Sequence, residues 1–148
     1  MNNTIAVTVL VENTARDRGL MGEHGLAYYV QAGGRTLLFD TGQTSLIIQN
    51  ARRLGIELSG LDAVALSHGH YDHTGGLHAV LGIARDAELY THPAACARRF
   101  ARNPDGTTRD VGIGRESLDS IQARPERIHE TTTATEVAQG VFLTGEIP

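Results

Sequence analysis

The segment 65–76, ALSHGHYDHTGG, concentrates more chemistry than any other part of this sequence. It places three histidines and one aspartate within six residues: His68, His70, Asp72 and His73. His68 and His70 follow an apolar run two residues apart, so in extended backbone both imidazoles point to the same side. The carboxylate and the third imidazole come where the chain turns, and they face a neighbouring point. A chance surface loop of this composition between a buried strand and a Gly-Gly pair is improbable, and we interpret the segment as a metal site.

These four ligands fall into two groups, and each group could hold one metal ion close to the other. Crowded ligands need tight backbone turns, which Gly69, Gly75 and Gly76 can supply because glycine has no Cβ. Imidazole together with carboxylate suits Zn and also Mn or Fe, so the ligands alone do not choose the metal.

The pattern on both sides of this segment predicts mixed strands and helices, and hence an α/β or α+β sheet covered by helices. The pair Gly33-Gly34 between two apolar runs predicts a hairpin, because glycine accepts positive φ. The expected strands are 4–12, 25–32, 35–40, 62–66, 88–91, 127–129, 135–137 and 141–143. The expected helices are 44–54, 77–81, 93–100 and 116–123, and 101–114 is expected to be a loop or a mobile hairpin.

Composition narrows the class of protein further. The chain has 148 residues, a length typical of one domain spanning 1–148, and a net charge of −4, which argues against a nucleic-acid-binding surface. All 13 cationic residues are arginine, which excludes a Schiff-base lysine and a P-loop lysine. The single cysteine, Cys96, cannot form an internal disulfide. We therefore expect a cytoplasmic protein without a membrane span, a secretory signal or a nucleic-acid partner.

The motif HGHYDH at 68–73 matches the H-x-H-x-D-H signature of the metallo-β-lactamase superfamily. The segment 39–42, FDTG, resembles the strand-end aspartate of that superfamily. The segments 23–26, EHGL, and 66–77, LSHGHYDHTGGL, resemble one branch, which contains the archaeal dihydropterin–aminobenzene ribofuranosyl phosphate synthases. The pair 92–93 and the stretch 103–118 also resemble that branch, so the resemblance covers nearly the whole chain.

The resemblance implies a four-layer αββα sandwich with a dinuclear site, most simply two Zn ions with Mn or Fe as alternatives, at one edge of the sheets. His68 and His70 would bind the first metal, and Asp72 and His73 the second. Asp72 would also accept a proton in catalysis, and the hydrolytic members would use a bound water as the nucleophile.

The superfamily takes further ligands from the second half of its fold: a third histidine, a bridging Asp or Cys, and a late histidine. In this branch the histidines lie in Ser-His-Ala-Gly-like and Phe-His-Leu-like segments, and this sequence contains neither. The sequence therefore predicts the N-terminal part of one metallo-β-lactamase-like domain. We expect it to be completed by a missing C-terminal half or by a second copy of itself.

Four residues outside the motif are candidates for the pocket or for orienting ligands: Glu23, His24, Asp40 and His92. Asp40 ends an expected strand and is interpreted as a residue that orients a ligand. For His24 a structural and a functional role are equally favoured, and His92 matches a family position near the site.

Other polar residues are more simply interpreted as packing or surface residues. His78 is expected to pack or lie at the surface, and His129, on a half-exposed strand, is a poor substitute ligand. A group of arginines could hold a phosphorylated or anionic substrate, although such a group is more often a solvated surface. Its members are Arg98, Arg99, Arg102, Arg109 and Arg115.

Two functions compete at this point. The first is a metal-dependent hydrolase-like enzyme acting on a small molecule, with a pterin-type synthase as a variant. The second is an inactive or partner-dependent fragment with an incomplete metal site. A nuclease of the same superfamily is a minor candidate because the chain is acidic.

Overall fold

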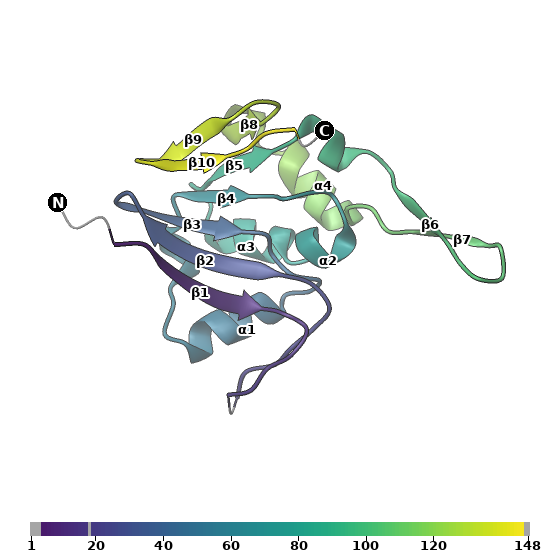
Figure 1. The fold of residues 1–148 in the computed structure, drawn as a ribbon, viewed down its shortest axis with the longest axis horizontal. Coiled ribbons are helices and arrows are strands. Elements are labelled where there is room, and N and C mark those ends of the chain that lie inside the picture. Colours follow the sequence, from purple (N-terminus) through teal and green to yellow (C-terminus); the bar gives the residue numbers. More distant parts are fainter. Residues whose placement is uncertain (1–3, 18, 147–148) are drawn as a thin grey trace.

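A six-stranded mixed sheet forms the centre of the computed structural model, which describes residues 4–17 and 19–146 (Figure 1). The strand order is β1-β2-β3-β4-β5-β8. Its strands are β1 (Ala6–Val11), β2 (Ala27–Ala32), β3 (Arg35–Phe39), β4 (Ala63–Ala65), β5 (Glu88–Thr91) and β8 (Ile128–Glu130). The first three are antiparallel neighbours, whereas β3, β4, β5 and β8 run parallel. The carboxyl ends of β3, β4 and β5 therefore share one edge, where open α/β sheets place their sites.

The turn between β2 and β3 shows why the antiparallel part forms. Ala32 pairs with Arg35, which leaves a two-residue loop of Gly33 and Gly34. Both glycines have positive φ, 57° and 77°, as a tight hairpin turn with the twist of its strands requires. The predicted glycine hairpin is confirmed.

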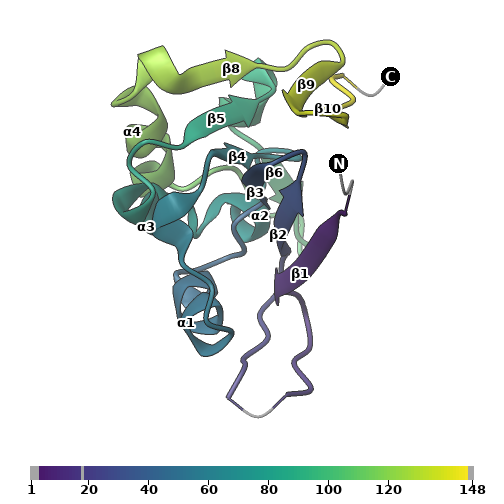
Figure 2. The same cartoon turned by 90° about the vertical axis from the view of Figure 1, so that its left-hand side faces the viewer.

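Helices cover one face of the sheet, and a separate hairpin lies on the other (Figure 2). The helical face carries α1 (Leu46–Arg53), α3 (Leu77–Ile83) and α4 (Arg115–Gln122). The opposite face carries β9 (Thr135–Ala138) and β10 (Val141–Leu143), an antiparallel pair. The short helices are α2 (Tyr71–Thr74), η1 (Leu58–Gly60), η2 (Pro93–Cys96) and η3 (Pro125–Arg127).

The main core lies between the sheet and the helices. Leu38 and Val64 from neighbouring strands are fully buried there against Ile47 of α1 and Leu77 and Leu81 of α3. Burial of aliphatic side chains on this scale is the principal force that holds such a layer on a sheet.

The other face of the sheet is also apolar but is covered less completely. Ala63, Ala65 and Tyr90 pack with Val137 and Ala138 of β9 in a second, smaller cluster. A cavity of about 400 Å³ remains between this face and the β9–β10 hairpin. Its lining includes Val7, Val30, Phe39 and Tyr90 from the sheet, with Val141 and Phe142 from β10. The mixed α/β fold predicted from the sequence is confirmed, with a helical layer, a sheet and the two-stranded β9–β10 sheet on its other face.

One predicted helix is wrong. The range 93–100 is not a helix, because η2 ends at Cys96 and Ala97 has extended backbone. Phe100 instead opens β6 (Phe100–Arg102), which pairs with β7 (Thr108–Asp110) in a hairpin that projects from the body (Figure 1). Pairing with the next strand in a hairpin outweighed the helical preference of the alanines. No helix in the described ranges is long and apolar enough to cross a membrane.

The core of the sheet gives a first prediction. Leu38→Ala should lower the free energy of unfolding by about 2–5 kcal/mol, because it leaves a cavity at a fully buried position of β3. Ile5→Ala, at a side chain that is 66% exposed, should change it by only about 0.5 kcal/mol or less. Urea unfolding followed by circular dichroism measures both, and equal losses would contradict the burial described here.

Candidate metal centre

The candidate site lies where β3 and β4 end side by side. Asp40 directly follows β3, and Ser67, His68 and His70 follow β4, which pairs with β3 in parallel. The chain then turns into α2, which carries Asp72 and His73. The parallel pairing thus brings together residues that are about 30 positions apart in the sequence.

Asp40 is the centre of the polar contacts at this edge. Its side chain is fully buried, and its backbone has a φ of 59°, rare for a residue other than glycine. The backbone N–H of Ser67 donates to Asp40 Oδ1 at 2.8 Å. The Ser67 hydroxyl donates to Oδ2 at 2.7 Å, and His73 Nδ1 lies 2.7 Å from the same oxygen. A buried carboxylate needs such partners, and Asp40 has three.

These contacts determine which nitrogen of each imidazole carries the proton. His73 Nδ1 faces a carboxylate oxygen, so it must carry a hydrogen and leave Nε2 with its lone pair. The Ser67 hydroxyl donates its hydrogen to Asp40, so it can only accept from His68. His68 Nδ1, which lies 2.8 Å from the Ser67 oxygen, must therefore carry a hydrogen and donate it. In their neutral forms both imidazoles therefore present a free Nε2 lone pair, the form that binds metals.

The histidine rings are close to one another. The ring centre of His68 is 4.5 Å from that of His70 and 4.3 Å from that of His73. Burial lowers the pKa of His68 below its ordinary value, and the neighbouring His73 and His70 lower it further. Both causes favour neutral His68.

Asp72 lies between two imidazoles. His24 Nε2 is 3.2 Å from Asp72 Oδ2, and His73 Nε2 is 3.6 Å from the same oxygen. Glu23, the neighbour of His24, instead faces the start of α1, where Oε1 accepts from the backbone N–H groups of Gln43 and Thr44. The sequence candidates His24 and Asp72 are thus in contact, whereas Glu23 holds the backbone beside them.

Glycines allow the close backbone contacts around this site. A Cβ at Gly69 would overlap the carbonyl oxygen of Ala95, and one at Gly75 would overlap that of Gln43. Gly76 is similarly close to the carbonyl oxygen of Thr41. The expectation that these three glycines permit tight backbone approach is confirmed.

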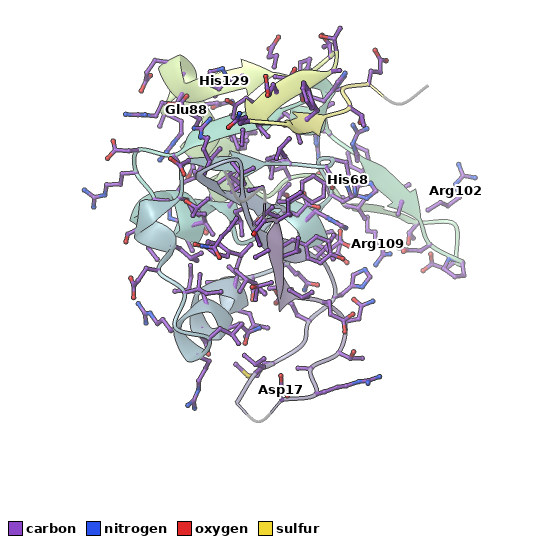
Figure 3. All side chains as sticks on the ribbon, turned by 60° about the vertical axis from the view of Figure 1, so that its left-hand side comes forward. Asp17, His68, Glu88, Arg102, Arg109 and His129 are labelled. Atoms are coloured by element: carbon purple, nitrogen blue, oxygen red, sulfur yellow. The ribbon has the colours of Figure 1, made fainter. Side chains whose placement is uncertain are left out.

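Three other histidines are engaged elsewhere. His92 Nδ1 accepts from the backbone N–H of Ala94 and caps η2, at the end of β5. His78 lies 2.8 Å from the Ser120 hydroxyl. His129 stacks on Tyr90 and lies 2.6 Å from Glu88, away from His68 (Figure 3). The hydrogen bond with His129 is the main reason why the pKa of Glu88 lies below its ordinary value.

Sequence reasoning missed Ser67, which links Asp40 to His68. Its position between the end of β4 and the first histidine could have indicated a role in orienting that histidine. Thr41 was also missed: its backbone N–H and its hydroxyl both donate to the carbonyl oxygen of His73, at 2.8 and 3.0 Å. Such contacts depend on the parallel pairing of β3 and β4.

The donors present fit a divalent metal in kind. Neutral His73 Nε2 and Asp72 Oδ2 are both acceptors, yet they face each other at 3.6 Å. Two ligands bound tetrahedrally at about 2.0–2.2 Å from Zn are about 3.4 Å apart, so a cation between these atoms would resolve their repulsion. In residues 4–17 and 19–146, however, no group of three or more His, Cys, Asp or Glu is placed to hold a metal. The described donors therefore form pairs and not a closed site.

Comparison with known proteins identifies relatives over most of the chain. Residues 20–145 match the family model described as the metallo-beta-lactamase superfamily. An uncharacterized protein of Methanocaldococcus jannaschii is 33% identical over 145 residues, which is 96% of this chain and 53% of that protein. The 7,8-dihydropterin-6-methyl-4-(beta-D-ribofuranosyl)-aminobenzene-5'-phosphate synthase of the same organism is 27% identical, over 84% of this chain and 44% of its own length.

Two further matches are a ribonuclease and a solved metallo-beta-lactamase structure. Ribonuclease Z of Mycobacterium marinum is 30% identical over 75% of this chain and 42% of its own length. Among solved structures, the Rm3 metallo-beta-lactamase superposes with a TM-score of 0.51 at 21% identity, over 80% of this chain and 44% of that one. The chain spans about half the length of the curated relatives it matches.

The contacts of Asp40 give a second prediction. Asp40→Ala should destabilise the fold by more than about 2 kcal/mol, because it removes the acceptor of Ser67 and His73 and leaves alanine at positive φ. Asp40→Asn keeps the shape, can still bond both partners and tolerates this backbone, so it should cost at least about 1 kcal/mol less. Urea unfolding compares them, and equal losses would show that these hydrogen bonds do not stabilise the protein.

Proposed function

The chain belongs to the metallo-beta-lactamase superfamily, and on that premise we propose that it is a metal-dependent, hydrolase-like enzyme acting on a small molecule. His68 and His70 would hold one metal, and Asp72 and His73 a second, with Zn the first choice and Mn or Fe the alternatives. Metal binding in this superfamily is typical, but the assignment of these four ligands is our own.

The single observation that supports this proposal is the chain of contacts from Asp40. One buried carboxylate fixes His73 directly and His68 through the Ser67 hydroxyl. Both rings are then held in the metal-binding tautomer before any metal arrives. A carboxylate that orients ligating histidines in this way raises their basicity and fixes their direction. A histidine-rich surface loop without function would have no reason to contain this arrangement.

A metal held by these donors would act as a Lewis acid that stabilises negative charge developing on the substrate. The chain's own residues have separate tasks. His68, His70 and His73 present nitrogen lone pairs, and Asp72 would accept a proton during the reaction. Asp40 does not face the substrate, because its side chain is fully buried.

The reaction itself has two candidates. Hydrolysis is favoured because the superfamily includes hydrolytic enzymes, and ribonuclease Z is among the relatives. A pterin-type synthase reaction is favoured by the 27% identical synthase of Methanocaldococcus jannaschii, whose name identifies its product class. In both, the described donor pairs would need further ligands, which a longer chain, a second copy or a separate partner could supply.

An anionic substrate is proposed from the β6–β7 hairpin. Arg102 and Arg109 are exposed on it (Figure 3), and neither has an ion-pair partner in the described ranges. The hairpin acids are already engaged, since Asp105 accepts from Thr107 and Asp110 from Gly112 and Arg98. The base of the hairpin is tied to the site, because the Tyr71 backbone N–H donates to the carbonyl oxygen of Val111. Free guanidinium groups on a hairpin whose base contacts the site suit phosphate recognition.

Metal binding tests the proposed site. The wild-type chain should bind Zn²⁺ in isothermal titration calorimetry, and His68→Ala or Asp72→Ala should each weaken binding by about 10-fold or more through loss of a ligand. His78→Ala, which removes a histidine bonded to Ser120, is the matched control and should bind as wild type does. A wild-type chain that binds no Zn²⁺, Mn²⁺ or Fe²⁺, or variants that bind equally well, would contradict the proposal.

Anion binding by the β6–β7 hairpin is tested by adding ribose 5-phosphate to the metal-free chain. We expect the ligand to shift backbone NMR signals of residues 98–110, whereas ribose should not, because the interaction needs the charged phosphate. Arg102→Ala together with Arg109→Ala should abolish the shifts. Arg52→Ala, an exposed arginine on α1, should leave them unchanged. Shifts that persist in the double variant would exclude the hairpin as the anion site.

A further inference from the structure

The segment 22–26 crosses the candidate metal centre and brings His24 to Asp72. His24 Nε2 lies 3.2 Å from Asp72 Oδ2, although the two residues are 48 positions apart. The His24 side chain is 64% exposed and that of Asp72 is 14% exposed. His24 is therefore not a core residue, and its position over Asp72 needs an explanation from the backbone that carries it.

Glu23 anchors this backbone on one side. Its Oε1 accepts from the backbone N–H groups of Gln43 and Thr44, at 2.9 and 3.0 Å. Its Oε2 accepts from the Thr44 hydroxyl at 2.6 Å. Charge-assisted bonds to backbone N–H groups are among the stronger ones in proteins. One carboxylate thus attaches the segment at three points to the turn that follows Asp40.

Gly25 allows the segment to approach on the other side. Its φ is +132°, and a Cβ built there would overlap the carbonyl oxygen of Asp72. Its backbone N–H donates to Asn13 Oδ1 at 3.3 Å, and the neighbouring Leu26 carbonyl accepts from Gly42. Any other residue at position 25 would displace the segment from α2.

The three residues thus act together: Glu23 attaches the segment, Gly25 permits contact with the backbone of Asp72, and His24 between them faces the Asp72 carboxylate. An incidental surface ion pair would not need a clamp on one side and a close backbone approach on the other. A pair with one partner as exposed as His24 contributes little to stability by itself, so the arrangement is better explained by the site it serves.

We propose that His24 is a positioning residue for Asp72: its imidazole N–H holds Oδ2 and directs the remaining lone pairs of the carboxylate toward the metal. This inference rests on the proposed function. Carboxylates that bind metals are themselves oriented by hydrogen bonds, and loss of such a partner typically weakens metal binding about 10–100-fold. His24 takes that role for Asp72, as Asp40 does for His73.

The experiment compares His24→Ala, His24→Gln and the control His78→Ala in the full chain. Zn²⁺ affinity is measured by competition with a chromophoric chelator. His24→Ala should bind Zn²⁺ about 10–100-fold more weakly, with an unchanged thermal midpoint without metal. His24→Gln, which keeps a side-chain N–H donor, should restore most of the affinity, and His78→Ala should match wild type. Unchanged affinity in His24→Ala, or no recovery in His24→Gln, would overturn the proposal.

A second measurement needs no metal. In ¹⁵N-edited spectra of the metal-free chain, Asp72→Asn should shift the ring nitrogens of His24 and leave those of His129 unchanged, because His24 contacts Asp72 whereas His129 contacts Glu88. No shift at His24 would contradict the contact itself. If the wild-type chain binds no metal but this shift occurs, the metal site fails while the pairing of His24 with Asp72 stands.

Discussion

The buried carboxylate of Asp40 is the interaction on which the candidate site depends. It is fully enclosed, it lies at an unfavourable backbone angle, and its partners are Ser67 and His73 from the next strand and helix. A buried charge of this kind is tolerated only where hydrogen bonds compensate for the lost water. Strain and desolvation at Asp40 thus persist because the parallel pairing of β3 with β4 supplies the donors, a combination that is common at functional sites.

Features with a local signal were predictable from the sequence, whereas contacts that depend on strand pairing were not. The glycine hairpin, the helix before Gly55 and the polar segment after β4 carry local signals, and they were predicted. The helix expected over 93–100 was wrong because the chain is already extended at Ala97 and Phe100 pairs with Asp110, so the hairpin expected within 101–114 begins earlier than its Gly, Asp and Asn residues indicate. Ser67 was missed because its role depends on Asp40, which lies 27 positions away and reaches it only across the sheet.

The sequence could predict which side chains form the candidate site, but it could not predict how they contact one another. The spacing of His68, His70, Asp72 and His73 indicated metal ligands, and the motif identified the superfamily. The contact of His24 with Asp72 could not be derived from spacing, since it needs the β1–β2 connection to return over α2. The sequence indicated His24 and Glu23 only as pocket candidates, without a partner for either.

The apolar face of the sheet and the candidate site are physically coupled. Side chains alternate along β3 and β4, so Leu38 and Val64 face the helices while Phe39 and Ala65 face the cavity under β9–β10. Phe39 directly precedes Asp40, and Ala65 lies two residues before Ser67. A chain that packed into this cavity would contact Phe39 and Ala65, the last residues of the two strands that lead to Asp40 and Ser67. Covering the apolar face and adding ligands to the incomplete donor pairs are therefore tasks that one structural element could perform together.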